Sequence, residues 1–209
     1  MFSFTRTVLV IFGLVATVTA AAAEAKKDIR IATFAGGCFW CVESDFDHVP
    51  GVVKTISGYT GGKLKNPSYK DVTGGNSGHY EAVQIFFDPQ KTTYAKLLEV
   101  FWRSVDPTDE GGQFCDRGMS YLTAIFANNP EQKKLALASK KTLVDSKILK
   151  DPIVTPVLEA GKFYPAESYH QNYYKNNKYR YKFYRFNCGR DARVKQLWGD
   201  QAHQGITQR

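Results

Sequence analysis

The stretch that decides the fold reads Ile29-Arg30-Ile31-Ala32-Thr33-Phe34-Ala35-Gly36-Gly37-Cys38-Phe39-Trp40-Cys41-Val42-Glu43. The apolar run from Ile29 to Ala35 is typical of a strand. Two glycines then allow the backbone to turn sharply before a helical segment that begins with a cysteine. We therefore expect a strand, a glycine turn and a helix, with Cys38 at the N-terminus of the helix.

The position of Cys38 predicts a reactive sulfur. Unpaired N–H groups and the positive end of the helix dipole favour thiolate over thiol, which lowers a pKa that is about 8.5 in free cysteine. Cys41 follows one helical turn later on the same face, within reach of Cys38. We expect the pair to cycle between dithiol and disulfide.

Structural interpretations of the cysteines are also open. The Cys38–Cys41 pair could be a structural disulfide or half of a zinc site, but no second Cys-x-x-Cys or suitably spaced histidine pair supplies two further ligands. With Cys115 and Cys188 the chain has four cysteines, which allow three pairings. A chain of 209 residues does not need disulfides to be stable, which weakens a purely structural role.

The N-terminus has the features of a signal peptide over Met1–Ala23. Arg6 supplies the positive region, Val8 to Val18 the apolar region, and Ala21-x-Ala23 a cleavage site. An uncleaved anchor is the alternative, although the apolar run is short for a spanning helix. We expect export to the bacterial periplasm, no stable membrane association, and one globular domain over residues 24–209.

The formal charge of +8, or +7 without the single Arg6 of the leader, could indicate nucleic acid or a membrane surface as a partner. The positive residues are dispersed except over 175–185. From Phe163 to Phe186 tyrosines and lysines interleave, a composition that could stack on bases. Because no repeat is present, we favour tyrosine bodies and lysine stems that wrap a core, and we expect no nucleic-acid partner.

The rest of the chain alternates strands and helices. We expect strands over 52–59, 79–87, 120–127 and 153–158, and helices from Tyr69, over 93–105 and over 130–146. Pro156 predicts an edge strand, and the long loop 106–119 is of a kind that often carries function. The fold class expected is α+β: a single domain with a central mixed β-sheet flanked by helices, of the ferredoxin-like α/β plait type, with a long C-terminal coil and a loose tail after Trp198.

Glu81 is a candidate proton donor. It follows His79 and Tyr80 at the start of a predicted strand. A carboxyl group in apolar surroundings has a raised pKa and can remain protonated as a general acid. An ordinary surface position on the strand is the alternative.

Five motifs occur in an order that resembles the A-type peptide methionine sulfoxide reductases. They are Gly37-Cys38-Phe39-Trp40, Gly78-His79-Tyr80-Glu81-Ala82-Val83, Asp106-Pro107-Thr108, Asp116-Arg117-Gly118 with Ser120-Tyr121, and Tyr169-His170-Gln171. The resemblance covers about residues 31–198. It identifies the domain as a methionine sulfoxide reductase catalytic domain.

The resemblance implies roles for individual residues. Cys38 corresponds to the catalytic nucleophile and Glu81 to the proton donor for the sulfoxide oxygen. Tyr69 and Tyr121 correspond to tyrosines that hydrogen-bond this oxygen, and Asp116 to an acidic residue near the site. The wall around the substrate's S-methyl group and the border of the pocket would be formed by Phe39, Trp40, His170 and Tyr173.

The implied activity is reduction of the S epimer of methionine sulfoxide, protein-bound or free, in the repair of oxidative damage. It would proceed through a Cys38 sulfenic acid and an intramolecular disulfide. A thioredoxin-like protein would restore the thiols, no metal or organic cofactor is implied, and we expect a monomer.

The chain departs from the commonest family pattern at its cysteines. Many relatives have glycine at position 41 and carry resolving cysteines in a Gly-rich C-terminal tail, whereas no cysteine follows Trp198 here. We expect Cys41 to resolve the sulfenic acid, with Cys188 as the alternative and Cys115 as a bystander.

Two other function classes compete with this interpretation. One is a thioredoxin-like oxidoreductase that uses Cys38 and Cys41 on protein disulfides, which insulin reduction without sulfoxide reduction would reveal. The other is a non-enzymatic secreted module that binds polyanions through 164–190, which steeply salt-dependent retention on an anionic matrix would reveal.

Overall fold

The computed structural model describes residues 1–2 and 28–207. The predicted signal peptide lies outside the described residues except for Met1 and Phe2, as does the predicted domain start at residue 24. Among the described helices, none is both long and apolar enough to cross a membrane.

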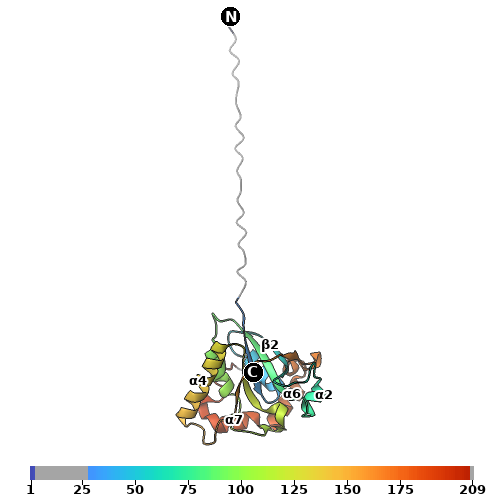
Figure 1. The fold of residues 1–209 in the computed structure, drawn as a ribbon. Coiled ribbons are helices and arrows are strands. Elements are labelled where there is room, and N and C mark those ends of the chain that lie inside the picture. The colour runs from blue at the N-terminus through green and yellow to red at the C-terminus, as the bar shows by residue number, and fades with distance from the viewer. Residues whose placement is uncertain (3–27, 208–209) are drawn as a thin grey trace.

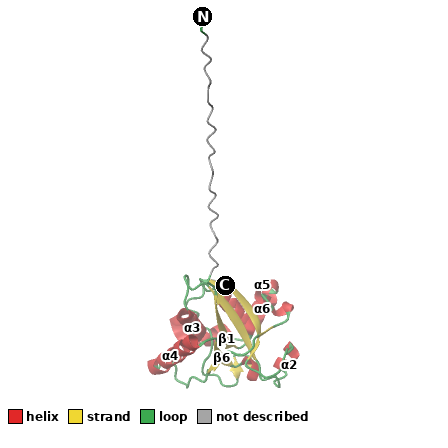
Figure 2. Ribbon diagram, turned by 45° about the horizontal axis from the view of Figure 1, so that its top comes forward, coloured by secondary structure: helices red, strands yellow, loops and turns green. Residues whose placement is uncertain are grey.

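A six-stranded mixed sheet forms the centre of the fold (Figures 1 and 2), with the strand order β7-β6-β1-β3-β2-β8. All neighbouring strands are antiparallel except β6 and β7, which are parallel. The strands are β1 (Arg30–Gly36), β2 (Val52–Thr60), β3 (Tyr80–Phe87), β6 (Thr123–Ala127), β7 (Val157–Glu159) and β8 (Tyr164–Pro165), with a separate hairpin of β4 (Gly112–Gln113) and β5 (Asp116–Arg117).

The helices connect these strands as in an α/β plait. The four strands β6-β1-β3-β2 are all antiparallel and are joined in the order β1-α1-β2-β3-α3-β6. The helices are α1 (Phe39–Asp47), α2 (Tyr69–Thr73), α3 (Tyr94–Trp102), α4 (Pro130–Ser146), α5 (Tyr173–Asn176), α6 (Lys178–Asn187) and α7 (Arg190–Trp198), with 3-10 turns at Met119–Tyr121, Ser168–His170 and Gly199–Gln201. The predicted single-domain α+β class, with a mixed sheet flanked by helices, is confirmed.

The main core lies between α1, α3 and one face of the sheet. Phe34 of β1 is fully buried, with its ring centroid 5.5 Å from Phe46 of α1 and 5.0 Å from Phe101 of α3. The hydrophobic cluster on the opposite face of the sheet is smaller. There the small side chains of Ala35 and Ala82 belong to a cluster that also includes residues of the coil after β7. Figure 2 shows α3 and α4 to the left of the strands and α2, α5 and α6 to the right.

The predicted edge strand exists but is shorter than expected. β7 is the outermost strand and begins only at Val157. The amides of Val154 and Thr155 donate to the carbonyl of Pro107, so the backbone N–H groups just before Pro156 bind the 106–119 loop and not a neighbouring strand. Pro156 itself has no N–H to donate to a neighbouring strand.

The predicted long C-terminal coil is wrong from Tyr173 onward, where α5, α6 and α7 follow. Tyr181 and Arg185 lie on the inner face of α6 and are buried, so burial of this face accounts for the helix. The final segment is not loose either, because the amide of Thr207 donates to the His48 carbonyl at 2.9 Å. The aromatic segment thus packs inward, while its outer face exposes Tyr179 and Phe183.

Replacing Phe34 tests the main core. Because Phe34 is fully buried among aromatic rings, we expect Phe34→Ala to lower the free energy of unfolding by about 3–5 kcal/mol. Phe183→Ala removes a phenyl ring that is 73% exposed and should change it by less than about 0.5 kcal/mol. Urea denaturation measures both, and equal effects would contradict this description of the core.

Candidate active site

The glycine turn places Cys38 at the start of α1, as predicted. Gly36 ends β1, and Cys38 is the N-cap residue of α1. Gly37 has a φ of 79°, and a Cβ atom there would lie 2.5 Å from Cβ of Gln113. A side chain at position 37 is therefore excluded by both backbone conformation and space.

Glu81 lies beside Cys38. It is 1% exposed, and its Oε2 accepts a hydrogen bond of 2.9 Å from the Phe39 amide in the first turn of α1. Burial raises the pKa of Glu81 to about 8, and this outweighs the amide hydrogen bond, which lowers it. A carboxyl group with this pKa keeps its proton at neutral pH.

Two phenols complete the polar side of the site. The hydroxyls of Tyr69 and Tyr121 share a hydrogen bond, and both side chains lie within electrostatic range of Glu81. Burial raises the pKa of Tyr69 to about 12 and also raises that of Tyr121, so both groups keep their protons. Glu167 fixes the first residue of α2 by accepting from the Tyr69 amide at 2.9 Å.

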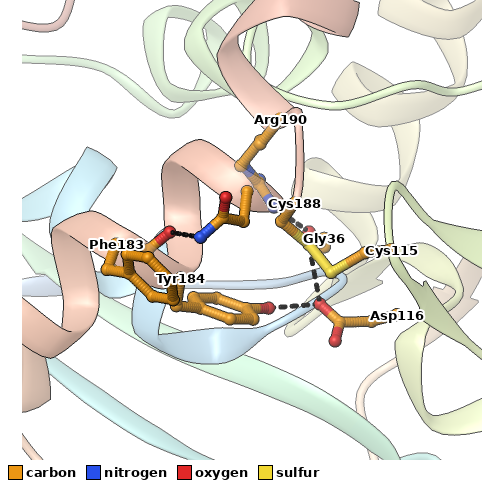
Figure 3. Close-up of a disulfide and its surroundings, with 8 residues drawn as sticks. Gly36, Cys115, Asp116, Phe183, Tyr184, Cys188 and Arg190 are labelled. Atoms are coloured by element: carbon orange, nitrogen blue, oxygen red, sulfur yellow. Dashed lines mark hydrogen bonds between the residues drawn. A yellow bond between two sulfur atoms is a disulfide. The ribbon is translucent and has the colours of Figure 1, made fainter.

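Asp116 approaches from the β4–β5 hairpin (Figure 3). Its Oδ2 accepts a hydrogen bond from the Tyr184 hydroxyl of α6. Burial raises the pKa of Asp116, although the bond from Tyr184 lowers it. Its charge acts on both Cys38 and Glu81, so it belongs to the same electrostatic unit.

The predicted apolar wall has Trp40 at its centre. The indole stacks on Tyr173 at a centroid distance of 3.7 Å, and its Nε1 donates to Nδ1 of His170 at 3.0 Å. Burial lowers the pKa of His170, which favours the neutral ring that this bond requires. Phe39 is 1% exposed, so its ring lies on the core side of this wall. The predicted catalytic and substrate-binding residues thus converge at the N-terminus of α1.

The predicted lowering of the Cys38 pKa is wrong. Burial raises the pKa of Cys38 well above its usual value, and the hydrogen bond to Cys41 and the charges of Glu81 and Asp116 act in the same direction. Burial also raises the pKa of Cys41, but the bond from Cys38 and two arginine charges bring it down to about 7. Of the two thiols, Cys41 therefore has the lower pKa.

Cys115 and Cys188 form a disulfide, while Cys38 and Cys41 are free. Cys115, expected to be a bystander in the resolving step, is thus paired with the alternative resolving cysteine. Figure 3 shows the disulfide beside Asp116, whose Oδ2 is 3.8 Å from Sγ of Cys188. Cys115, Asp116 and Cys188 have ligand atoms within 4.8 Å of one another, but sulfurs bonded to each other offer no thiolate to a metal.

The sequence of the chain matches a family model described as peptide methionine sulfoxide reductase over residues 30–202. The chain belongs to the peptide methionine sulfoxide reductase family. It is 57% identical to the peptide methionine sulfoxide reductase MsrA of Bacillus licheniformis, over 81% of this chain and 94% of that protein. It is 51% identical to MsrA 2 of Rhizobium meliloti, over 94% and 98% of the two chains. Like other peptide methionine sulfoxide reductases, the protein is an oxidoreductase.

Solved structures agree with this assignment to the peptide methionine sulfoxide reductases. Methionine sulfoxide reductase A of Corynebacterium diphtheriae superposes with a TM-score of 0.65 at 30% identity, covering 72% of this chain and 76% of that one. Reduced Mxr1 of Saccharomyces cerevisiae gives 0.67 at 29% identity, covering 73% and 90%.

Several site residues of this reductase escaped the sequence analysis. Glu167 binds the Tyr69 amide and Tyr184 donates to Asp116. The others interact electrostatically with Cys41 and are Asp45, Tyr181, Arg185 and Arg190. Tyr181, Tyr184 and Arg185 recur at the spacing of one helical face, a signal that the interleaved aromatic and basic composition obscured. His79, by contrast, is structural: its Nδ1 accepts from the Gly62 amide at 3.1 Å and its Nε2 lies 2.8 Å from the Leu64 carbonyl.

The pH dependence of sulfoxide reduction tests the protonated state of Glu81. The acid must keep its proton to donate it, so we expect activity to fall as pH rises through about 8. Glu81→Gln should lower kcat by about 10²–10⁴-fold and remove this descending limb.

The matched control is Glu159→Gln on β7, where the side chain is 79% exposed. It should leave both kcat and the profile unchanged. A descending limb at the same pH in Glu81→Gln would contradict the assignment of the titrating group.

Proposed function

We propose that the protein reduces the S epimer of methionine sulfoxide, free or within oxidised proteins, with Cys38 as nucleophile and Glu81 as proton donor. The observation that carries this proposal is the 2.9 Å bond that joins Glu81 to the residue after Cys38. It lets one small molecule touch a sulfur nucleophile and a neutral carboxyl group at once.

The chemistry requires this pairing. A sulfoxide sulfur is a poor electrophile until its oxygen is protonated, so acid and nucleophile must act together. Tyr69 and Tyr121 supply further hydrogen-bond donors for the oxygen, and their raised pKa values keep them protonated. The products are methionine and a Cys38 sulfenic acid.

Selectivity for one epimer would come from two fixed points. The oxygen is directed to Glu81 and the phenols, while the S-methyl group rests against Trp40. The indole is held on one side by Tyr173 and at its N–H by His170, which supports a rigid methyl site. Only one chirality at sulfur satisfies both points while exposing the sulfur to Cys38.

Cys41 is the resolving cysteine in this proposal. It contacts Cys38 through a side-chain hydrogen bond, so a disulfide between them requires little movement. Cys188, the alternative, is bonded to Cys115 and would first have to be reduced. The water released and the disulfide formed complete the half-reaction.

Recycling and location form the final part of the proposal. A thioredoxin-like dithiol protein reduces the Cys38–Cys41 disulfide, and a leader at Met1–Ala23 directs a monomer to the bacterial periplasm. The Cys115–Cys188 disulfide supports an oxidising compartment. A site assembled within one chain supports a monomer.

Turnover of the separated sulfoxide epimers with dithiothreitol tests the activity. We expect methionine from the S epimer alone, and none from Cys38→Ala, because that variant lacks the nucleophile. Equal turnover of both epimers would contradict the two-point geometry. Insulin reduction without sulfoxide reduction would support a disulfide oxidoreductase in its place.

Cysteine variants test the resolving step. Without external thiol, Cys41→Ser should form one equivalent of methionine and accumulate the sulfenic acid, which dimedone labelling and mass spectrometry detect. Cys188→Ser should form the Cys38–Cys41 disulfide and retain no sulfenic acid. The reverse pattern would assign resolution to Cys188.

A further inference from the structure

The outer face of α6 carries three exposed aromatic rings. Tyr179, Phe183 and Phe186 are 89%, 73% and 84% exposed. At about 100° per residue they lie within about 60° of one another around the helix, so they form one stripe about 10 Å long, the α6 stripe. Over residues 28–207, Tyr169 is the only other Phe, Tyr or Trp that is exposed. A gathering of exposed rings on one helix face indicates an interaction surface.

Three exposed cations flank the α6 stripe. Lys178 and Lys182 lie along one side of it and Arg180 lies along the other. Within the part of the chain that the structure describes, no carboxylate is paired with any of these flanking cations. Residues 168–190 include six Lys and Arg side chains and no Asp or Glu. The stripe therefore lies in a region of uncompensated positive charge.

A cavity of about 950 Å³ adjoins the α6 stripe on its lysine side. Phe186, Lys178 and Lys182 belong to its lining, so the stripe and the cavity are continuous. Among the described residues, Asp191 is the only carboxylate of this lining, and its Oδ1 is 2.7 Å from Nη2 of Arg185. The cavity is thus electropositive, which suits the anionic group of a ligand.

We propose that the outer face of α6 docks the protein reversibly on an anionic phospholipid surface. The rings of the α6 stripe enter the interfacial layer, the flanking cations bind lipid phosphates, and the cavity accommodates a headgroup. Amphipathic helices that lie in the plane of a membrane combine rings and cations in this way. The inference goes beyond the proposed function and does not rest on it.

The combination of rings and cations favours a bilayer over other anionic partners. A bilayer offers an anionic layer directly above an apolar one, so cations and rings are satisfied at different depths. The long stems of Lys and Arg allow their charged ends to remain at the phosphates while the rings lie deeper. A soluble polyanion that binds the cations through its phosphates would leave the phenyl rings of Phe183 and Phe186 in water.

Sedimentation of the protein with phospholipid vesicles tests the docking. We expect binding to mixed phosphatidylglycerol and phosphatidylcholine vesicles, and much weaker binding to phosphatidylcholine alone. Each Lys or Arg near an anionic surface contributes about fivefold to the affinity, so the combined variant Lys178→Gln, Arg180→Gln, Lys182→Gln should bind about 100-fold more weakly. Raising the NaCl concentration should weaken wild-type binding.

Replacing all three residues of the α6 stripe by serine should also lower the affinity, by about tenfold or more, because no ring then leaves water. Both α6 variants should keep the wild-type unfolding midpoint, since the replaced side chains are exposed. Two control variants remove as many exposed apolar side chains or charges from the region of α4, and each should weaken binding by no more than about twofold. They are Leu137→Ser, Val144→Ser and Ile148→Ser in one variant, and Lys134→Gln, Lys141→Gln and Lys150→Gln in the other.

A single indole measures insertion of the stripe directly. After subtraction of wild-type emission, Phe183→Trp should show a shift to shorter wavelength with anionic vesicles and quenching by lipids brominated on their acyl chains. Leu137→Trp on α4 should show neither change. This readout is local, so it does not depend on any binding of the N-terminus to vesicles.

Several results would overturn the proposal. Equal binding to both kinds of vesicle, or equal losses in the α4 controls, would show that α6 does not recognise anionic lipid. Full binding by the serine variant, or an unquenched indole at position 183, would show that the rings do not enter the bilayer. A wild type that is dimeric in solution and becomes monomeric in the serine variant would assign the stripe to a second copy of the chain.

Discussion

The structure depends on a buried carboxyl group held against the first turn of a helix. The side chain of Glu81 is almost completely enclosed, and its acceptance of the Phe39 amide joins β3 to α1 beside Cys38. A pKa raised from 4.5 to about 8 corresponds to about 5 kcal/mol against ionisation in the folded protein. This is the net of the burial penalty and the opposing hydrogen bond from the Phe39 amide, so the neutral acid prevails despite that bond.

Strand register sets the position of that group. Tyr59 of β2 pairs with Glu81, and Phe34 of β1 pairs with Val83, two residues further along β3. Successive side chains of a strand alternate between faces, so Glu81 lies on the face of Val83 that α1 and α3 cover. A shift of one residue would move the carboxyl group to the other face of the sheet. The same strand register therefore fixes both the pairing of the sheet and the position of the catalytic acid.

Sequence reasoning placed β1, β2, β3, β6 and the helices α1 to α4, but it missed the C-terminal helices, the side chains that they bring to the site and the raised pKa of Cys38. The strand, glycine turn and helix around Cys38 are local features that residue types reveal. A helix N-terminus did not lower the pKa of Cys38, because the sulfur is buried and because Glu81 and Asp116 approach it from distant parts of the chain. Side chains alternate along β3, so Glu81 lies on the same face as the apolar Val83. This pattern could have predicted from the sequence that Glu81 is buried.

Contacts between distant parts of the chain could not be predicted from local sequence patterns. The pairing of Cys115 with Cys188 joins a hairpin to the end of α6 across 73 residues, and four cysteines alone do not select it. Arg185 and Arg190, whose charges lower the pKa of Cys41, also come from remote helices. Aromatic and basic residues in this region suggested a surface, yet α6 turns Tyr181 and Arg185 inward, and burial of this face replaces the coil expected there.

The most direct test of the central claim is infrared spectroscopy of the Glu81 carboxyl group across pH, with Glu81→Gln to assign the band. If burial keeps this acid neutral, its C=O stretch should persist through neutral pH and convert to the carboxylate signal near pH 8. Complete conversion by pH 5, near the value for an exposed glutamate, would show that the acid has no proton to give and would contradict the account.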